Sequence, residues 1–147
     1  MPQPDLLSWE PPQTVLAFEE VEVRGATLAA RISRAVSVAL RDCGQPRKRV
    51  AKAMGDYLGE DVSPAMLDAY ASVGRDQHRI SVPRMMALMH ATGDRRLMEM
   101  LAEPMGWAVI ERRFLPLIRV AALRDREDEL RREREALMRR ARGEGAL

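Results

Sequence analysis

The run QPRKRVAKAMGDYLGEDVSPAMLDAYASVGRDQHR, residues 45–79, predicts two short helices joined by a tight turn. The first helix begins at Pro46, because proline is well tolerated in a first helical turn. It ends before Gly59, because glycine readily adopts the left-handed backbone of a helix end. Ser63 and Pro64 then supply an N-cap and a first-turn residue for the second helix. Two short helices around a glycine-containing turn predict a helix-turn-helix, a unit that places its second helix in the major groove of DNA.

Both predicted helices are amphipathic. The expected buried faces comprise Val50, Met54, Tyr57 and Leu58 in the first helix, and Met66, Leu67, Tyr70 and Ala71 in the second. The outer face of the second helix then holds the candidates for contact with base edges, which are Ser63, Ala65, Asp68, Ala69 and Ser72. Two readings of Asp68 stay open, because its carboxylate can accept from a cytosine amine or can repel phosphate.

Positive charge gathers at the start of the first helix, where the free N–H groups of a helix end also face outward. The candidate phosphate contacts there are Gln45, Arg47, Lys48, Arg49 and Lys52. Arg75 and Arg79 follow the second helix, together with His78 and Arg84, and we expect them to hold the opposite DNA backbone. For each arginine taken alone, a solvated surface position is the alternative.

The runs AKAMGDYLGEDVSPAMLDAYAS, residues 51–72, and RDQHRISVPRMMALMHATGD, residues 75–94, resemble phage-encoded transcriptional regulators of the CII/CP76 type, as found in Mu-like prophages. The resemblance covers roughly residues 45–103. Its motif consists of Leu58, Gly59, Val62, Ser63, Met66 and Leu67. It implies a phage-repressor-like helical fold, double-stranded DNA as a partner and a role in transcription regulation.

Composition sets wide limits on function. The 147 residues include 24 basic and 22 acidic ones, a net charge of +2 that permits nucleic-acid binding without arguing for it. Only 4% of residues are aromatic, and the Leu-, Met- and Ala-rich remainder favours helices. Cys43 is the single cysteine, so no disulfide framework is expected. No run approaches the ~20 apolar residues of a membrane span. The N-terminus lacks signal-peptide features, so the expected location is the cytoplasm.

We therefore predict an all-α fold, a compact helical bundle containing the helix-turn-helix and followed by a long charged C-terminal helix. Residues 1–24 form an irregular proline-rich arm, in which Trp9 either docks a partner or folds back onto the core. Residues 25–106 form the DNA-binding domain, with further helices over residues 25–42, 81–92 and 94–103. Residues 107–147 form the C-terminal helix.

The C-terminal helix is expected to run from Trp107, with a kink or restart at Pro116. Its candidate self-association residues are Phe114, Leu117, Ile118, Leu123, Leu130 and Leu137. The last three leucines recur every seven residues, but the second apolar position of each heptad is mostly charged, so a long coiled coil has weak support. Two alternatives remain, a helix that pairs over a turn or two and a single helix held by ion pairs. The expected pairs are Glu127–Arg131, Asp128–Arg132 and Glu135–Arg139.

No catalytic set emerges, because His78 and His90 lie on different predicted elements and no spacing matches a metal site or a nucleotide loop. We expect no enzyme, no metal and no cofactor. The predicted function is sequence-specific DNA binding by a phage or prophage transcriptional regulator. It would act as a homodimer or larger oligomer, so that two recognition helices lie one DNA turn apart, ~34 Å. The alternatives are a protein–protein module that keeps the fold and, less favoured, a scaffold subunit that polymerises through the charged helix.

Overall fold

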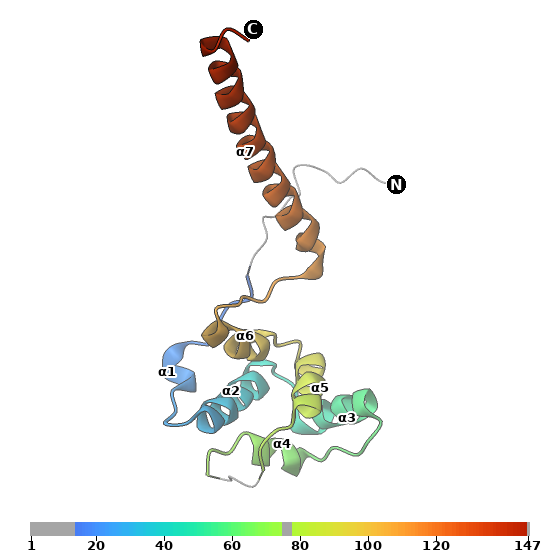
Figure 1. The fold of residues 1–147 in the computed structure, drawn as a ribbon. Helices are drawn as coiled ribbons and strands as arrows, with labels where there is room; N and C mark the ends of the chain where they lie inside the picture. The colour runs from blue at the N-terminus through green and yellow to red at the C-terminus, as the bar shows by residue number, and fades with distance from the viewer. Residues whose placement is uncertain (1–13, 75–77, 147) are drawn as a thin grey trace. The chain divides into compact units, whose positions relative to one another are not determined.

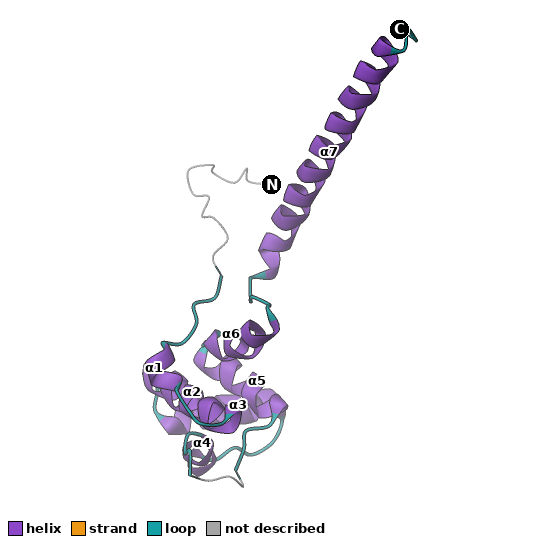
Figure 2. Cartoon of the chain, turned by 60° about the vertical axis from the view of Figure 1, so that its left-hand side comes forward, coloured by secondary structure: helices purple, strands orange, loops and turns teal. Residues whose placement is uncertain are grey.

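The computed structural model describes residues 14–74 and 78–146, and every regular element in these ranges is helical (Figure 1, Figure 2). The predicted all-α fold with a long C-terminal helix is confirmed. The described chain divides into two compact units, one over Thr14–Val109 and one from Ile110 onward. Trp9 and Arg75 lie outside the described residues.

The first unit is a bundle of short helices. Its elements are α1 (Glu20–Val23), α2 (Leu28–Asp42), α3 (Arg47–Leu58), α4 (Pro64–Tyr70), α5 (Val82–Thr92), α6 (Arg96–Ala102) and the 3-10 helix η2 (Glu103–Met105). Helix α3 packs mainly against α5 and also contacts α4, whereas α2 contacts α1, α4 and α6 (Figure 1). Helix α5 thus supports α3, and α2 supports α4.

The predicted end of the first motif helix and the predicted start of the second are confirmed, whereas the first begins one residue later than predicted, at Arg47, with Pro46 as its N-cap. Gly59 ends α3 in the left-handed conformation, with φ 70°. Ser63 is the N-cap of α4, and Pro64 lies in its first turn. Helix α2 begins later than expected, at Leu28, because the Thr27 hydroxyl accepts a hydrogen bond from the Ala30 N–H and caps the helix there.

The core of the first unit lies between α2, α3, α4, α5 and α6. Its largest fully buried side chains are Val36, Leu40, Val50, Met54, Leu67, Leu88 and Leu97. Phe18 and Val23 also join this core, so the segment before α2 packs on the bundle. Tyr57 was predicted to be buried but is 47% exposed, and its ring lies against the His90 ring with the two centroids 4.6 Å apart.

The second unit consists of η3 (Arg112–Phe114) and α7 (Leu115–Gly143). The prediction of a helix from Trp107 is wrong, because the chain has no helix from Trp107 to Glu111. Pro116 lies in the first turn of α7, where no intrahelical bond to its nitrogen is needed. The proline therefore marks a helix start instead of a kink.

Helix α7 carries ion pairs in a different register from the predicted one. The observed pairs join Arg126 with Glu129, Arg131 with Asp128, and Arg140 with Glu144. These exposed pairs each add little to stability.

Across the described ranges, no helix is both long enough and apolar enough to span a bilayer.

Candidate nucleic-acid interface

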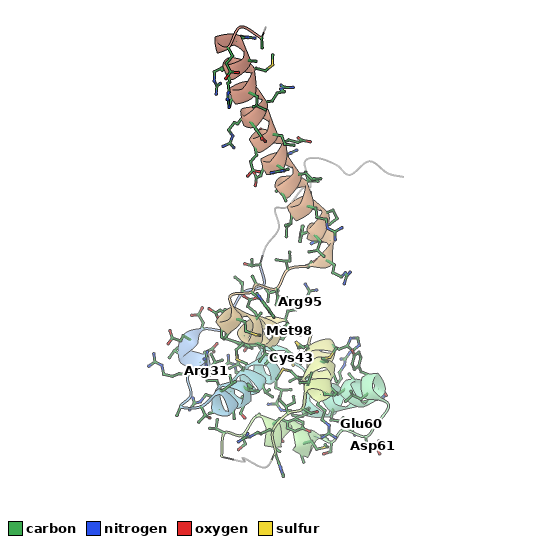
Figure 3. All side chains as sticks on the ribbon, in the orientation of Figure 1. Arg31, Cys43, Glu60, Asp61, Arg95 and Met98 are labelled. Carbon is green, nitrogen blue, oxygen red and sulfur yellow. The ribbon has the colours of Figure 1, made fainter. Side chains whose placement is uncertain are left out.

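The turn between α3 and α4 folds back closely onto α3 at Gly55. The Gly55 carbonyl accepts hydrogen bonds from the N–H groups of Gly59 and Glu60, at 2.8 and 3.3 Å. A Cβ on Gly55 would lie 2.8 Å from the Glu60 carbonyl oxygen, closer than real Cβ contacts allow. Glu60 and Asp61 project from this turn (Figure 3). The chain can turn back this tightly only because residue 55 is a glycine.

Arg47 joins the start of α3 to both α4 and α2. Its Nε donates to Asp68 Oδ1 at 3.2 Å, and its Nη1 donates to the Leu40 carbonyl oxygen at 3.0 Å. The sequence predicts Arg47 as a phosphate contact and Asp68 as a base contact, whereas the structure brings these two side chains together. Both are engaged in orienting α4 against α3.

The positive charge that remains available lies next to Arg47. Lys48 and Arg49 are exposed, and within the described residues neither forms an ion pair or a side-chain hydrogen bond. Lys52 is also exposed, but its Nζ lies 2.6 Å from Asp56 Oδ2. Gln45 is half-buried before the helix. Of the predicted phosphate contacts at the start of α3, Lys48 and Arg49 are thus the two cations without an ion pair.

The first turn of α3 is electrostatically unusual for a helix start. Its N-cap is Pro46, which has no side chain to accept a hydrogen bond, and the first turn contains no acidic residue. Arg47, Lys48 and Arg49 instead occupy the first three helical positions. Because a helix N-terminus carries a partial positive charge, cations there are unfavourable and an external anion would be favourable.

The outer face of α4 is smaller and less polar than predicted. The Ser63 hydroxyl accepts from the Met66 N–H at 3.3 Å as part of the helix cap. Ala65 is exposed, but Ala69 is only 5% exposed and Ser72 is half-buried. Placing Ala69 on the outer face is therefore wrong, because this seven-residue helix turns that position towards the bundle.

Arg79 is exposed on the segment after α4, as is His78. Arg84, by contrast, lies against α4 and the turn. Its guanidinium donates to the Tyr70 hydroxyl and, at 3.1 Å, to Glu60 Oε1. These hydrogen bonds, that to Tyr70 above all, raise the pKa of the Arg84 guanidinium. Arg84 therefore holds the turn, α4 and α5 together instead of offering a free charge.

A groove runs between α3 and the turn. Its lining residues include Pro46, Lys48, Arg49, Lys52, Asp56, Glu60, Asp61 and Pro64. The basic residues Lys48 and Arg49 belong to the start of α3, whereas Asp56, Glu60 and Asp61 belong to its end and to the turn. The groove thus combines a cationic end with an anionic one, and only the cationic end suits a phosphate.

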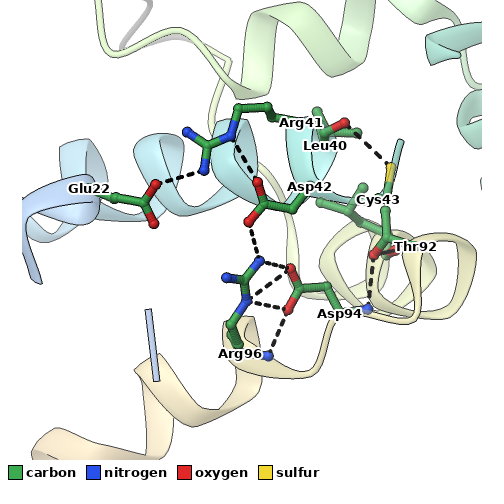
Figure 4. A network of polar contacts seen from close by, with 9 residues as sticks. Glu22, Leu40, Arg41, Asp42, Cys43, Thr92, Asp94 and Arg96 are labelled. Carbon is green, nitrogen blue, oxygen red and sulfur yellow. Dashed lines mark hydrogen bonds and ion pairs between the residues drawn. The ribbon is translucent and has the colours of Figure 1, made fainter. Parts of the chain in front are cut away.

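A network of charges that the sequence reasoning missed holds α1, α2 and α6 together (Figure 4). Arg41 joins Glu22 at 2.6 Å and Asp42 at 2.8 Å, and Arg96 joins Asp42 at 2.8 Å and Asp94 at 2.7 Å. No short motif indicates such a network, because two directly bonded members, Asp42 and Arg96, lie 54 residues apart.

The network shifts the pKa values of two of its members. Hydrogen bonds from Arg41 and then from Arg96 lower the pKa of Asp42 below its ordinary value of 3.8. Hydrogen bonds to Asp94 and then to Asp42 raise the pKa of the Arg96 guanidinium. Arg96 also lies over the Phe18 ring, with its Cζ 4.4 Å from the ring centroid. The network therefore ties the segment before α2 to the bundle and leaves the α3–α4 surface free.

The candidate self-association residues other than Phe114 lie on α7, which has no buried side chain, whereas Phe114 ends η3. Phe114 is half-buried, with Arg113 over its ring. The exposed fractions of the others are 41% for Leu117, 51% for Ile118, 64% for Leu123, 49% for Leu130 and 60% for Leu137. Such exposure on one helix is typical of a surface that a partner covers.

No group of three or more potential metal ligands comes together within the described ranges. Comparison with protein families, curated proteins and solved structures finds no match to this chain.

Proposed function

We propose that this chain is a DNA-binding protein that contacts duplex phosphates through the start of α3 and presents α4 to the major groove. The observation that carries the proposal is the run of three basic residues at the uncapped start of α3, with Lys48 and Arg49 unpaired within the described chain. Phosphate would relieve the repulsion between these cations and the helix dipole.

The arrangement of α3 and α4 supports the same proposal. Gly55 and Arg47 hold α4 at a set position against α3, as a recognition helix needs. The resemblance of residues 45–103 to CII/CP76-type regulators further suggests a phage or prophage transcriptional regulator. Such a protein would act on DNA in the cytoplasm.

The exposed leucines of α7 favour action as a homodimer or larger oligomer. The outer face of α4 offers few side chains for base readout, so one copy would bind with modest specificity. Two copies would double the contacts and relate two half-sites by symmetry.

The test is a fluorescence-anisotropy titration of the full chain against a mixed pool of duplex DNA at two salt concentrations. Affinity should fall steeply with salt. The variant Lys48→Glu/Arg49→Glu should bind more weakly and reduce the slope of log affinity against log salt by about 2, roughly 1 per lost phosphate contact. Arg47 is left unchanged, because replacing it would also break its bonds to Asp68 and Leu40.

The matched control is Arg139→Glu/Arg142→Glu, which makes the same change in charge at exposed positions of α7. It should retain most of the binding. Equal losses in both variants would mean that net charge alone attracts DNA. Absence of salt-sensitive binding to duplex DNA at low salt would overturn the proposal.

One observation favours a second candidate, a protein–protein module. Asp56, Glu60 and Asp61 line the same groove as Lys48 and Arg49, and acidic side chains repel phosphate. A mixed-charge groove suits a peptide with both signs of charge. Under this interpretation, duplex DNA would not bind at low salt, whereas a peptide that carries both signs of charge would.

A further inference from the structure

Helix α7 presents a row of leucines that no other part of the described chain covers. Leu123, Leu130 and Leu137 are seven residues apart and therefore lie along one face of the helix. Each is about half exposed or more, and none of the residues of α7 is buried. A charged helix that repeats a large apolar residue at this period is typical of a surface that pairs with another helix.

The residues between these leucines decide which orientation such a pair takes. Along the same face, Glu127 follows Leu123 by four residues and Arg134 follows Leu130 by four. Both side chains are exposed. Within the described chain, neither forms an ion pair or a side-chain hydrogen bond. The face therefore reads leucine, glutamate, leucine, arginine, leucine.

A parallel, in-register pair would place each of these residues beside its own copy. Glu127 would face Glu127 of the second copy, and Arg134 would face Arg134, both within the seam where side chains lose water. Like charges at such positions destabilise a pair. The sequence of the face thus argues against the parallel arrangement.

An antiparallel pair reverses one copy, and the pattern then complements itself. With Leu130 near the two-fold axis, Leu123 lies beside Leu137 of the second copy, and Glu127 lies beside Arg134 of the second copy. Symmetry repeats each contact, so the seam gains two ion pairs between three layers of leucine. Val120 and Ala141, which flank this segment, meet at its ends.

We infer that α7 pairs with α7 of a second copy in the antiparallel orientation, through Leu123, Glu127, Leu130, Arg134 and Leu137. The inference rests on the self-association in the proposed function and specifies its geometry. The starts of the two α7 helices would lie about 46 Å apart, from the 1.5 Å rise per residue of an α-helix. The two bundles are therefore attached at opposite ends of the paired helices.

Cysteine cross-linking of the full chain tests the orientation, in a Cys43→Ser background. Leu130→Cys should form a disulfide-linked dimer. Leu123→Cys alone should not, whereas an equimolar mixture with size-tagged Leu137→Cys chains should give the mixed disulfide. Cross-linking of Leu123→Cys to itself would establish a parallel pair. A chain that sediments as a monomer throughout would also overturn the inference.

Charge reversal provides a test that leaves the leucines intact. In the antiparallel pair, Arg134→Glu places two carboxylates together at both sites, so the dimer should dissociate at least about tenfold more readily. Glu127→Arg/Arg134→Glu restores opposite charges and should restore association. In a parallel pair the Glu127 site would be unchanged and the Arg134 site would exchange one like-charge contact for another, so the single reversal would have little effect. That result would overturn the inference.

Measuring pairing and DNA binding on the same protein preparations distinguishes a failure of the inference from a failure of the proposed function. An antiparallel dimer that shows no salt-sensitive DNA binding would overturn DNA binding and leave the pairing intact. A parallel dimer or a monomer that binds duplex DNA through Lys48 and Arg49 would overturn the antiparallel pairing and leave DNA binding intact.

Discussion

Gly55 leaves no room for a side chain where the turn between α3 and α4 approaches α3. Its missing side chain leaves room for the Glu60 carbonyl oxygen, which would lie 2.8 Å from an added Cβ. Because that atom belongs to the backbone, relief requires the whole turn to move. We expect Gly55→Ala to lower the free energy of unfolding by about 1–3 kcal/mol, as for overpacked sites, although alanine is the better helix former.

Urea unfolding followed by circular dichroism measures this loss. Gly74→Ala is the matched control, because a Cβ at Gly74 meets nothing within 4 Å. The control should change stability by less than about 1 kcal/mol. A stabilised Gly55→Ala protein would show that the turn does not need its close approach to α3.

Asp42 gives the stability of the bundle an acid-sensitive component. Its pKa lies below the ordinary value of 3.8 in the folded chain, because Arg41 and Arg96 donate to its carboxylate. The unfolded chain therefore takes up this proton first as the pH falls. The contribution is fully present above about pH 5, declines as the pH falls through 3.8 and is lost below the folded pKa.

The variant Asp42→Asn should be less stable than the parent chain at pH 7, and the gap between the two should narrow towards pH 3. Chemical denaturation at pH 7, 5, 4 and 3 measures the gap. Asp61→Asn is the control, because Asp61 is exposed on the turn and forms no ion pair within the described residues. A gap that stays constant over this range would contradict the assignment.

At the scale of helices, the cap of α4 decides how well this seven-residue element forms. The Met66 N–H donates to the Ser63 hydroxyl at 3.3 Å and also to the Ser63 carbonyl oxygen at 3.1 Å, so Ser63 supplies both of its acceptors at the helix start. Ser63→Ala should therefore lower the free energy of unfolding by about 1 kcal/mol. Ser81 occupies the same position in α5 but makes no side-chain cap bond, so Ser81→Ala should cost much less. Equal losses at both serines in urea unfolding would show that the Ser63 cap bond contributes nothing.

The elements that the sequence predicts well are those that local chemistry defines. Gly59 and Gly93 end helices, and Ser63 with Pro64 begins one, because a backbone conformation or an unpaired N–H needs those residue types wherever the chain goes. The same local rules place Pro116 at a helix start as readily as at a kink. What decides between them is the chain before it, which forms no helix over Trp107–Glu111.

The candidate site depends on contacts between distant residues, and the sequence predicts it less well. The cluster at the start of α3 is correctly placed, but its pairing of Arg47 with Asp68 spans 21 residues. Ala69 shows the same limit, because the packing around a helix of two turns sets its buried face. Gly55 did carry a signal, since a glycine inside a helical pattern is costly unless it has a packing role.

At the scale of the whole molecule, the two units differ in what holds them folded. The Thr14–Val109 unit has a continuous apolar core. Helix α7 has 29 residues and no buried side chain, so among the described residues its support within one copy comes from its own propensity and its exposed ion pairs. Isolated helices are marginal in water, and partner helices supply most of the stability of such segments. Its stability should therefore depend on protein concentration.

Hydrogen–deuterium exchange at two protein concentrations, about a hundredfold apart, tests this difference. Amide protection over Leu115–Gly143 should rise with concentration, because association stabilises the folded helix relative to its unfolded form. Protection of the core helices α2, α3 and α5 should not change, which provides the control within the same sample. The Arg134→Glu chain should need a higher concentration to reach the same protection of α7. Protection of α7 that is already complete at the lower concentration in both chains would show that one copy stabilises the helix by itself.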